Sequence, residues 1–205
     1  MKENFKKAII TSLFLGIAFF SVKSINYSDE IYSFKSANAA KITSIDGKAN
    51  TDKLTKRKVL SGKISILIPK SFELMSQQDL LTYYPLEDNR PTELYSNEAT
   101  NVSLSFNHTK TEANSESLAN VQVALEKTFD TPETAILKSG MVTINDNEFY
   151  VIELIMKDAE TDVYNIIFAT ILEGRLLIGG YDCQKIMYDE YKDFGKEILK
   201  SIEIN

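Results

Sequence analysis

The chain has 205 residues, a formal net charge of −6 and an apolar content of 43%. This composition is typical of one folded domain with extensions and argues against a disordered chain. A single cysteine excludes an intrachain disulfide, a single histidine excludes motifs that need two, and the acidic balance argues against nucleic-acid binding. The sequence contains no phosphate-binding loop, dinucleotide fingerprint or metalloprotease helix, so we predict no cofactor and no metal.

The first residues have the pattern of a secretory signal. Three lysines within Met1–Lys7 precede an apolar run from Ala8 to Phe20. As a helix this run covers only about 20 Å of the ~30 Å hydrocarbon core of a membrane, so a signal peptide is favoured over a membrane span. Two cleavage sites fit, after Ala39 at the end of an Ala-x-Ala sequence and after Ser24. We favour Ala39, which makes residues 1–39 a signal peptide.

The mature chain divides into a polar arm and a domain. Residues 40–60 predict a partly ordered N-terminal arm, and residues 61–205 form the domain. The arm contains the basic run 56–58, which we interpret as solvated rather than as a contact with an anionic surface, because three charges contribute little at physiological salt. We expect a periplasmic or extracellular protein whose membrane contact is limited to an uncleaved signal segment.

The domain opens with a strand and a short helix. Isoleucines alternate over residues 64–68 in strand spacing, and Pro69 ends the strand. Ser76 is a suitable N-cap for a helix. That helix must stop near Tyr84, because Pro85 disfavours the helical conformation in the residue before it.

The next segment alternates between two faces. Residues 94–95 predict a short strand, and a longer strand begins near Asn101. Its side chains divide into one set and an opposing polar set. The first set is Val102, Leu104, Phe106 and His108, and the second is Ser103, Ser105, Asn107 and Thr109.

The second half of the chain predicts two helices around a meander of strands. Apolar residues three and four apart predict helices over 115–129 and from Ile186 to about Ile202. Short turn sequences separate four strands, which indicates antiparallel hairpins. The strands are expected at 135–144, 148–156, 163–172 and 175–181. The middle two are apolar on both faces, so both faces must be covered. The sequence thus predicts an α+β fold, an antiparallel sheet of about six strands with helices on both faces (an α-β-α sandwich).

The order of these elements resembles the PsbP-like fold of lumenal photosystem accessory proteins, a Ran-binding nuclear import factor family and many exported bacterial proteins. Three segments carry the likeness: Ile64–Pro69 with Phe72, Leu176–Tyr181, and Phe194 with Ile198–Ile202. The stretch 84–109 looks like a small subgroup of uncharacterised exported bacterial proteins. The resemblance implies an accessory or binding role, since members of this fold are mostly non-enzymatic.

The segment 83–101 is the favoured binding loop. Two prolines restrict it, and Arg90 has the planar fork that clamps a carboxylate or phosphate; the alternative is that Arg90 pairs with a nearby acid. The candidate binding residues are Tyr84, Asn89, Arg90, Thr92, Tyr95, Asn97 and His108.

Three features are candidates for chemistry, and each has a plainer interpretation. His108 is either a general base or a partly buried, hydrogen-bonded histidine, and we favour the second. The acids in 158–162 begin like a calcium loop, but Val163 replaces the required glycine and Ala169 the required glutamate, so an acidic hairpin tip is favoured. Cys183 is interpreted as a small buried residue rather than a reactive thiol.

These observations predict an exported, non-catalytic binding or accessory protein that acts through the 83–101 loop and the sheet edge. Its expected partner is a protein of the cell envelope. The alternatives are an export chaperone that shields apolar client segments, which needs an exposed apolar patch, and a hydrolase that uses His108, which needs an open cleft. The sequence assigns no oligomeric state.

Overall fold

The computed structural model describes residues 54–87, 90–97, 102–157 and 161–205. The predicted signal peptide and most of the predicted arm lie outside these residues. Within the described part, no helix is long and apolar enough to cross a membrane.

Strands dominate the described chain. They are β1 (Leu54–Val59), β2 (Ile64–Pro69), β3 (Glu73–Leu74), β4 (Glu93–Asn97), β5 (Val102–Glu112), β6 (Thr134–Ile144), β7 (Asn147–Met156), β8 (Val163–Leu172), β9 (Arg175–Gln184) and β10 (Glu203–Ile204). The described α-helices are α2 (Gln77–Tyr83), α3 (Ser115–Phe129) and α4 (Tyr188–Lys200), and the short 3-10 helix η2 (Lys185–Met187) precedes α4. Ser76 caps α2 through the amide of Asp79, and α2 ends before Pro85 as predicted.

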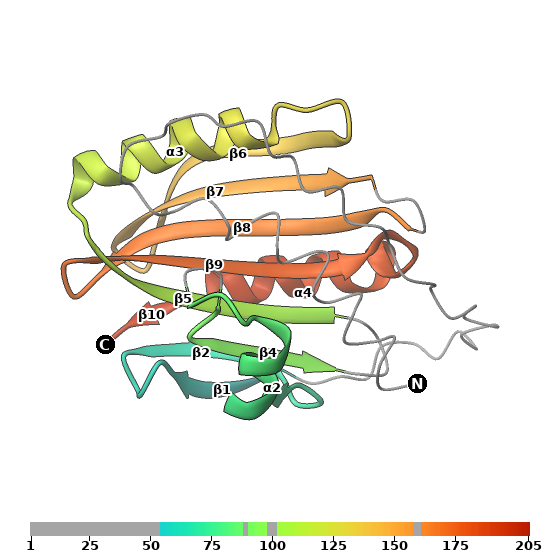
Figure 1. Cartoon of the computed structure of the whole chain (residues 1–205), viewed down its shortest axis with the longest axis horizontal. Coiled ribbons are helices and arrows are strands. Elements are labelled where there is room, and N and C mark those ends of the chain that lie inside the picture. Colours follow the sequence, from blue (N-terminus) through green and yellow to red (C-terminus); the bar gives the residue numbers. More distant parts are fainter. Residues whose placement is uncertain (1–53, 88–89, 98–101, 158–160) are drawn as a thin grey trace.

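The large sheet has seven antiparallel strands in the order β3-β4-β5-β9-β8-β7-β6 (Figure 1). The predicted meander is confirmed, because β6 to β9 lie side by side in chain order. Its two tight turns use residues with positive φ, the conformation that two-residue hairpins require. These are Asn145 and Asp146 at 45° and 65°, and Glu173 and Gly174 at 51° and 72°.

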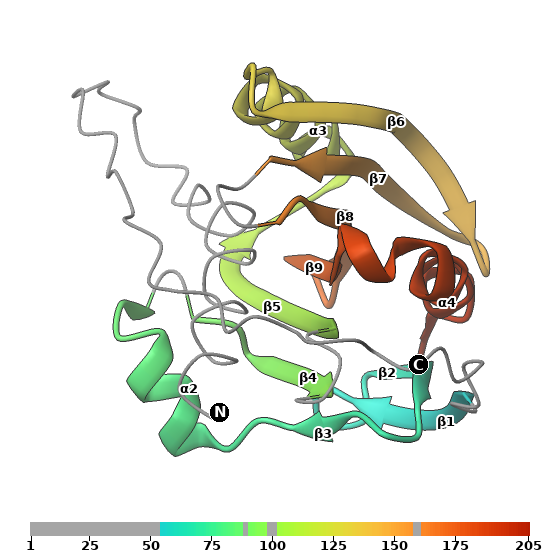
Figure 2. The same cartoon turned by 90° about the vertical axis from the view of Figure 1, so that its right-hand side faces the viewer.

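The two faces of this sheet carry two separate cores (Figure 2). On one face the buried stripe of α3 packs against alternate residues of β7, β8 and β9, among them Ile152, Ile167 and Ile178. On the other face α4 and the small sheet cover the intervening residues, among them Ile166 and Phe168. Each apolar face of the sheet is thus covered by other elements, as a sheet that is apolar on both faces requires.

The strand count differs from the predicted single sheet of about six strands. The large sheet has seven strands, and a second sheet of three strands, ordered β1-β2-β10, lies beside α4. The predicted arm over 40–60 was wrong at its end, since residues 54–59 form β1 and pair with β2. The prediction failed here because the sequence of β1 is rich in charged residues, which are typical of a solvated arm. Lys56 pairs with Glu203, and Arg57 donates to the carbonyl oxygens of Phe72 and Lys70 at 2.9 and 3.0 Å.

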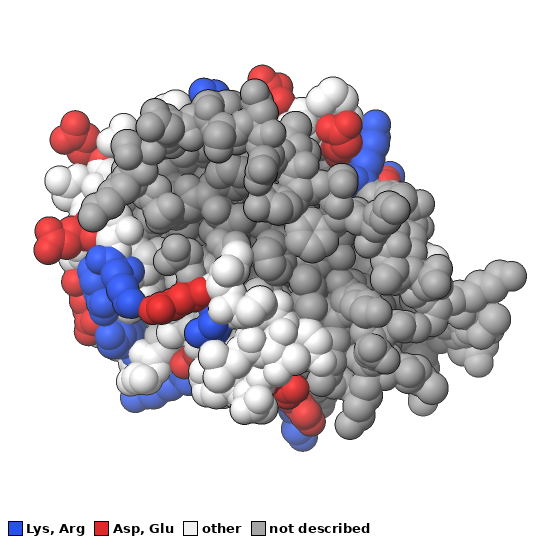
Figure 3. Space-filling model, viewed as in Figure 1, with Lys and Arg blue, Asp and Glu red and all other residues white. Residues whose placement is uncertain are grey.

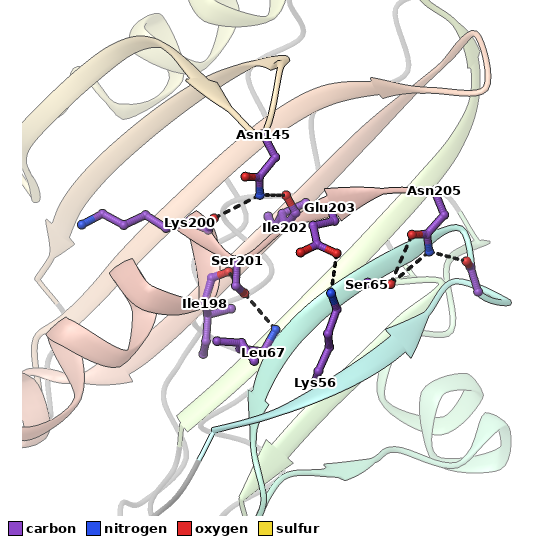
Figure 4. Close-up of polar contacts among 11 residues, drawn as sticks. Lys56, Ser65, Leu67, Asn145, Ile198, Lys200, Ser201, Ile202, Glu203 and Asn205 are labelled. Atoms are coloured by element: carbon purple, nitrogen blue, oxygen red, sulfur yellow. Dashed lines mark hydrogen bonds and ion pairs between the residues drawn. The ribbon is translucent and has the colours of Figure 1, made fainter.

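Polar side chains fasten the end of α4 to both sheets (Figure 4). Ser201 Oγ accepts a hydrogen bond from the amide of Leu67 at 2.8 Å. Asn145, in the turn between β6 and β7, donates to the carbonyl oxygen of Ile202 at 2.8 Å. Asn205 Nδ2 donates to the carbonyl oxygen of Gly62 at 2.8 Å. These bonds link the segment after α4 to β2, to the turn between β1 and β2, and to the turn between β6 and β7.

Gly195 sets how closely α4 approaches the sheet. A methyl group at this position would lie 2.5 Å from Cδ1 of Tyr181 and 2.9 Å from Cδ1 of Ile166. The Tyr181 hydroxyl, buried beneath α4, donates to the carbonyl oxygen of Tyr191 at 2.8 Å. Because Gly195 has no side chain, α4 packs directly against the Tyr181 ring.

We expect Gly195→Ala to destabilise the protein, although alanine favours a helix by about 1 kcal/mol over glycine. The added methyl group overpacks the contact with Tyr181, which costs about 1–3 kcal/mol. Urea unfolding followed by circular dichroism measures the change. Glu197→Ala, on the same helix, is the control; a Gly195→Ala variant that is more stable than the wild type would contradict the close packing.

Candidate functional site

His108 lies near the far end of β5, against the turn between β8 and β9. Its Nε2 is 3.0 Å from the carbonyl oxygen of Leu172, and its Nδ1 is 3.4 Å from Nη2 of Arg175. A carbonyl oxygen only accepts, so Nε2 carries the proton and Nδ1 faces the guanidinium. Partial burial, together with the charges of Arg175 and Lys63, lowers the pKa of His108. The imidazole is therefore a neutral, hydrogen-bonded group, as the plainer interpretation predicts.

The Arg90 side chain donates hydrogen bonds to the backbone of its own predicted binding loop. Its Nε donates to the carbonyl oxygen of Tyr84 at 2.8 Å, and its Nη2 donates to that of Pro85 at 2.9 Å. The backbone amide of Arg90 also donates to the carbonyl oxygen of Glu87 at 3.1 Å. The guanidinium thus holds the loop closed through main-chain oxygens, which neither sequence interpretation anticipated.

Thr92 joins this loop to the strand that carries His108. The Thr92 hydroxyl accepts a hydrogen bond from the backbone amide of His108 at 3.0 Å. Beside it, Lys110 pairs with Glu87 at 2.7 Å, and this contact holds the pKa of Glu87 below its usual value. The segment that carries Glu87, Arg90 and Thr92 therefore contacts β5 at His108 and Lys110, at one corner of the sheet.

The side chains of the other described candidates, Tyr84, Tyr95 and Asn97, make their contacts away from His108. Tyr95 is 6% exposed in the core beneath the small sheet, where its hydroxyl donates to Glu93 at 2.8 Å and its pKa is raised, mainly by burial. Tyr84, which follows α2, is buried in a small cluster with Leu80 of α2 and Leu94 of β4. Asn97 donates to Ser71 Oγ at 2.9 Å. Asn89 lies outside the described residues.

A hollow opens between the end of β5, the start of α3 and the β8–β9 turn, and its lining residue Arg175 contacts His108. Its volume is about 700 Å³. Its lining is Lys110, Glu112, Ala113, Asn114, Ser117, Glu173, Gly174 and Arg175. We call this hollow with Glu87, Arg90, Thr92 and His108 the corner surface. Charges of both signs line it, and Lys63 pairs with Glu173 at 2.5 Å, which lowers the pKa of Glu173.

Sequence reasoning missed Lys110, Glu112, Glu173 and Arg175. Antiparallel pairing of β5 with β9 places Glu112 opposite Arg175 and His108 opposite Leu177. The turn at 173–174 was recognisable, but nothing in the sequence says that β9 lies next to β5. The space-filling view in Figure 3 shows acidic and basic side chains interspersed over one face of the described residues.

A row of buried polar residues crosses four strands of the sheet. Ser96 lies opposite Ser103, Ser103 opposite Asp182, and Asp182 opposite Asn165. All are at most 8% exposed, and Ser103 Oγ donates to Asp182 at 2.6 Å. A slip of one residue would break this hydrogen bond and move the polar groups to the opposite, apolar face, so the row favours the observed register.

The other candidates for chemistry are placed apart from the corner surface. Cys183 is fully buried in the core on the α4 side, and burial raises the pKa of its thiol. Asp162 pairs with Lys185 at 2.8 Å, while residues 158–160 lie outside the described part. Among the described residues, no group of three histidine, cysteine, aspartate or glutamate side chains is arranged to hold a metal.

The fold is similar to that of cyanobacterial PsbP (CyanoP) from Synechocystis sp. PCC 6803, with a TM-score of 0.53 at 12% identity over 81% of this chain and all of that chain. The Ran-binding protein Mog1p of Saccharomyces cerevisiae gives a TM-score of 0.47 at 12% identity, covering 75% of this chain and 96% of that one. LpqN of Mycobacterium tuberculosis, involved in cell envelope biogenesis, gives 0.41 at 11%, covering 76% and 92%. No protein-family profile and no curated protein matches the sequence.

The predicted PsbP-like fold is therefore confirmed. At these identities the likeness concerns the fold alone. The likeness of residues 84–109 to exported bacterial proteins stays a prediction.

The titration of His108 tests the geometry of this corner. Because it is the only histidine of the chain, its ring protons can be followed by NMR without assignment. We expect a pKa below the usual ~6.5. Because the folded pKa is lowered, the stability that neutral His108 contributes is present above pH ~6.5 and declines as the pH falls.

Urea unfolding of wild type and His108→Gln between pH 7.5 and 5.5 checks the sign. The wild type should lose more stability on acidification than the variant does. A pKa above 6.5, or a larger loss in the variant, would show that the imidazole is not held as described.

Cys183 should resist alkylation in the folded protein, because it is buried and its thiol pKa is raised. Mass spectrometry after iodoacetamide treatment measures the modified fraction with and without urea. Labelling that needs urea is the expected result. Rapid labelling of the native protein would restore the reactive-thiol interpretation.

Proposed function

We propose that this protein is an exported, non-catalytic binding protein that holds a protein partner of the cell envelope at its corner surface. The observation that carries the proposal is the hollow of about 700 Å³ whose lining residue Arg175 contacts His108. Arg90 keeps the adjoining loop closed, which presents a preformed surface. A loop held on a rigid sheet is where recognition is commonly found.

The environment of His108 supports binding over hydrolysis. A general base needs a reacting group within hydrogen-bond reach of a free ring nitrogen. Here one ring nitrogen contacts the Leu172 carbonyl oxygen, and the other faces the Arg175 guanidinium. Neither neighbour is a nucleophile, and the Thr92 hydroxyl accepts from the backbone amide rather than from the ring.

The mixed charge of the hollow favours a partner that carries both signs. Lys110 and Arg175 lie on its lining with Glu112 and Glu173. A strongly charged ligand of one sign would meet like charges there as well as opposite ones. We therefore favour a protein surface of interspersed charges over a nucleic acid or a polyanion.

A second candidate, the export chaperone, draws support from three exposed leucines. Leu74, Leu81 and Leu86, from β3, α2 and the following loop, are 54%, 48% and 61% exposed. A surface that shields apolar segments needs such side chains to form one contiguous patch. A partner lost on changing these leucines, and kept on changing the corner charges, would favour this candidate.

Charge reversal at the hollow tests the proposal. Immobilised wild type, Lys110→Glu and Arg175→Glu are compared for capture of partners from native cell-envelope extract, with quantification by mass spectrometry. Lys110 is largely exposed, so its reversal should leave the fold intact. We expect a partner held by the wild type to be captured about tenfold less by both variants.

Lys192→Glu is the matched control. Lys192 is a lysine of α4, on the other side of the sheet, and has one ion pair with Asp189. Its reversal should leave capture unchanged, and thermal melts should show that all three variants fold. Equal capture by Lys110→Glu, Arg175→Glu and wild type would contradict the corner surface as the binding site.

A further inference from the structure

The edges of the two sheets differ in how they are protected. A strand edge exposes backbone donors and acceptors that can pair with another chain, and proteins blunt such edges with short strands, charges, prolines or caps. Along β2, the edge beyond the two-residue β10 has the Leu67 amide capped by Ser201, and Pro69 has no N–H. The edge strand β1 carries the basic run 56–58, and β3 has only two residues. These features block or disfavour pairing of another chain with β1, β2 or β3.

The edge formed by β6 is the exception in the described chain. It is the last strand of the seven-stranded sheet, has 11 residues and carries a single charge, Lys138. Residues 135–139 are exposed, and the side chains of Ile136, Leu137 and Met141 are 40%, 47% and 45% exposed. A bulge at Leu137 interrupts pairing near one end, and beyond it residues 138–144 pair regularly with β7.

The neighbouring helix α3 contacts this strand, and among the described residues β7 is its one strand neighbour. Glu126 of α3 accepts a hydrogen bond from Ser139 Oγ at 3.1 Å, which places the helix over one face of β6. Met141 pairs with Tyr150 on that same face, yet remains 45% exposed. An added strand would therefore find open backbone groups and, beside them, an accessible apolar side chain.

We propose that the outer edge of β6, over residues 138–144, is a strand-addition site for an extended segment of another polypeptide. The segment lies antiparallel to β6 and continues the pairing of the sheet. Backbone hydrogen bonds supply the attraction, and an apolar side chain of the segment packs beside Met141. This site is separate from the corner surface and goes beyond the proposed function.

Area and charge select an extended segment over a second copy of this chain. A stable interface between two folded copies buries at least about 1,200 Å². Only three large apolar side chains of β6 are exposed here. Two copies would also each carry a net charge of −6 and repel one another. A neutral or basic segment meets neither obstacle, because a single strand needs only the edge itself.

A synthetic peptide of alternating threonine and valine with a lysine at each end is the probe. Titration into the ¹⁵N-labelled full chain should shift amide signals of residues 134–144 and slow their hydrogen exchange. The same peptide with alternate backbone amides methylated cannot donate along one edge, and should bind at least tenfold more weakly. Equal binding of both peptides, shifts centred on another element, or no binding at all would overturn the proposal.

Side-chain charge provides a second test. Met141→Lys places a cation beside the basic probe and should weaken its binding at least fivefold. Ile186→Lys makes a similar change at a residue that is 71% exposed in η2 and should leave binding unchanged. Equal weakening by both variants would contradict the site, and a wild-type dimer in sedimentation with protected β6 amides would replace the segment by a second copy. Loss of capture by the corner variants leaves this experiment unaffected, so the two proposals fail separately.

Discussion

The central constraint is a sheet that is apolar on both faces and must be kept from water on both. Neighbouring residues of β8 show it most directly. Ile166 belongs to the core under α4, and Ile167 belongs to the core under α3, so one residue step crosses from one core to the other. Covering only one face would expose half of these side chains, at roughly 25 cal/mol for each Å² of apolar surface. The positions of α3, α4 and the small sheet follow from this constraint.

Packing of this kind leaves recognition to the margins of the sheet. The corner surface lies where strand ends and turns meet, and Arg90 holds its loop through backbone oxygens. The edge of β6 is a margin of another sort, because backbone groups rather than side chains are open there. The two surfaces therefore suit different partners, a folded protein surface at the corner and an extended chain at the edge.

Sequence reasoning predicted the elements whose patterns are local. The stripe of α3 and the N-cap at Ser76 are specified by residues close in sequence, and these predictions were confirmed. The hairpin turns predicted at 145–147 and 173–174 were confirmed too, although β7 already begins at Asn147. It missed β1, since its charged residues read as a solvated arm, and it missed Arg175, since strand order is set by long-range packing. Tyr95 was predicted to bind a partner, but it packs in the core. The prediction failed because an aromatic residue in so short a segment gives no sign of which face its side chain will take.

The most direct test of the two-sided core is a methyl NOESY spectrum of the full chain labelled at isoleucine, leucine and valine. We expect contacts from Ile166 to Ile198 of α4, and from Ile167 to Leu118 or Val121 of α3. Contacts from both isoleucines to the same helix, or rapid solvent exchange along one whole face of β8, would contradict the two-sided core.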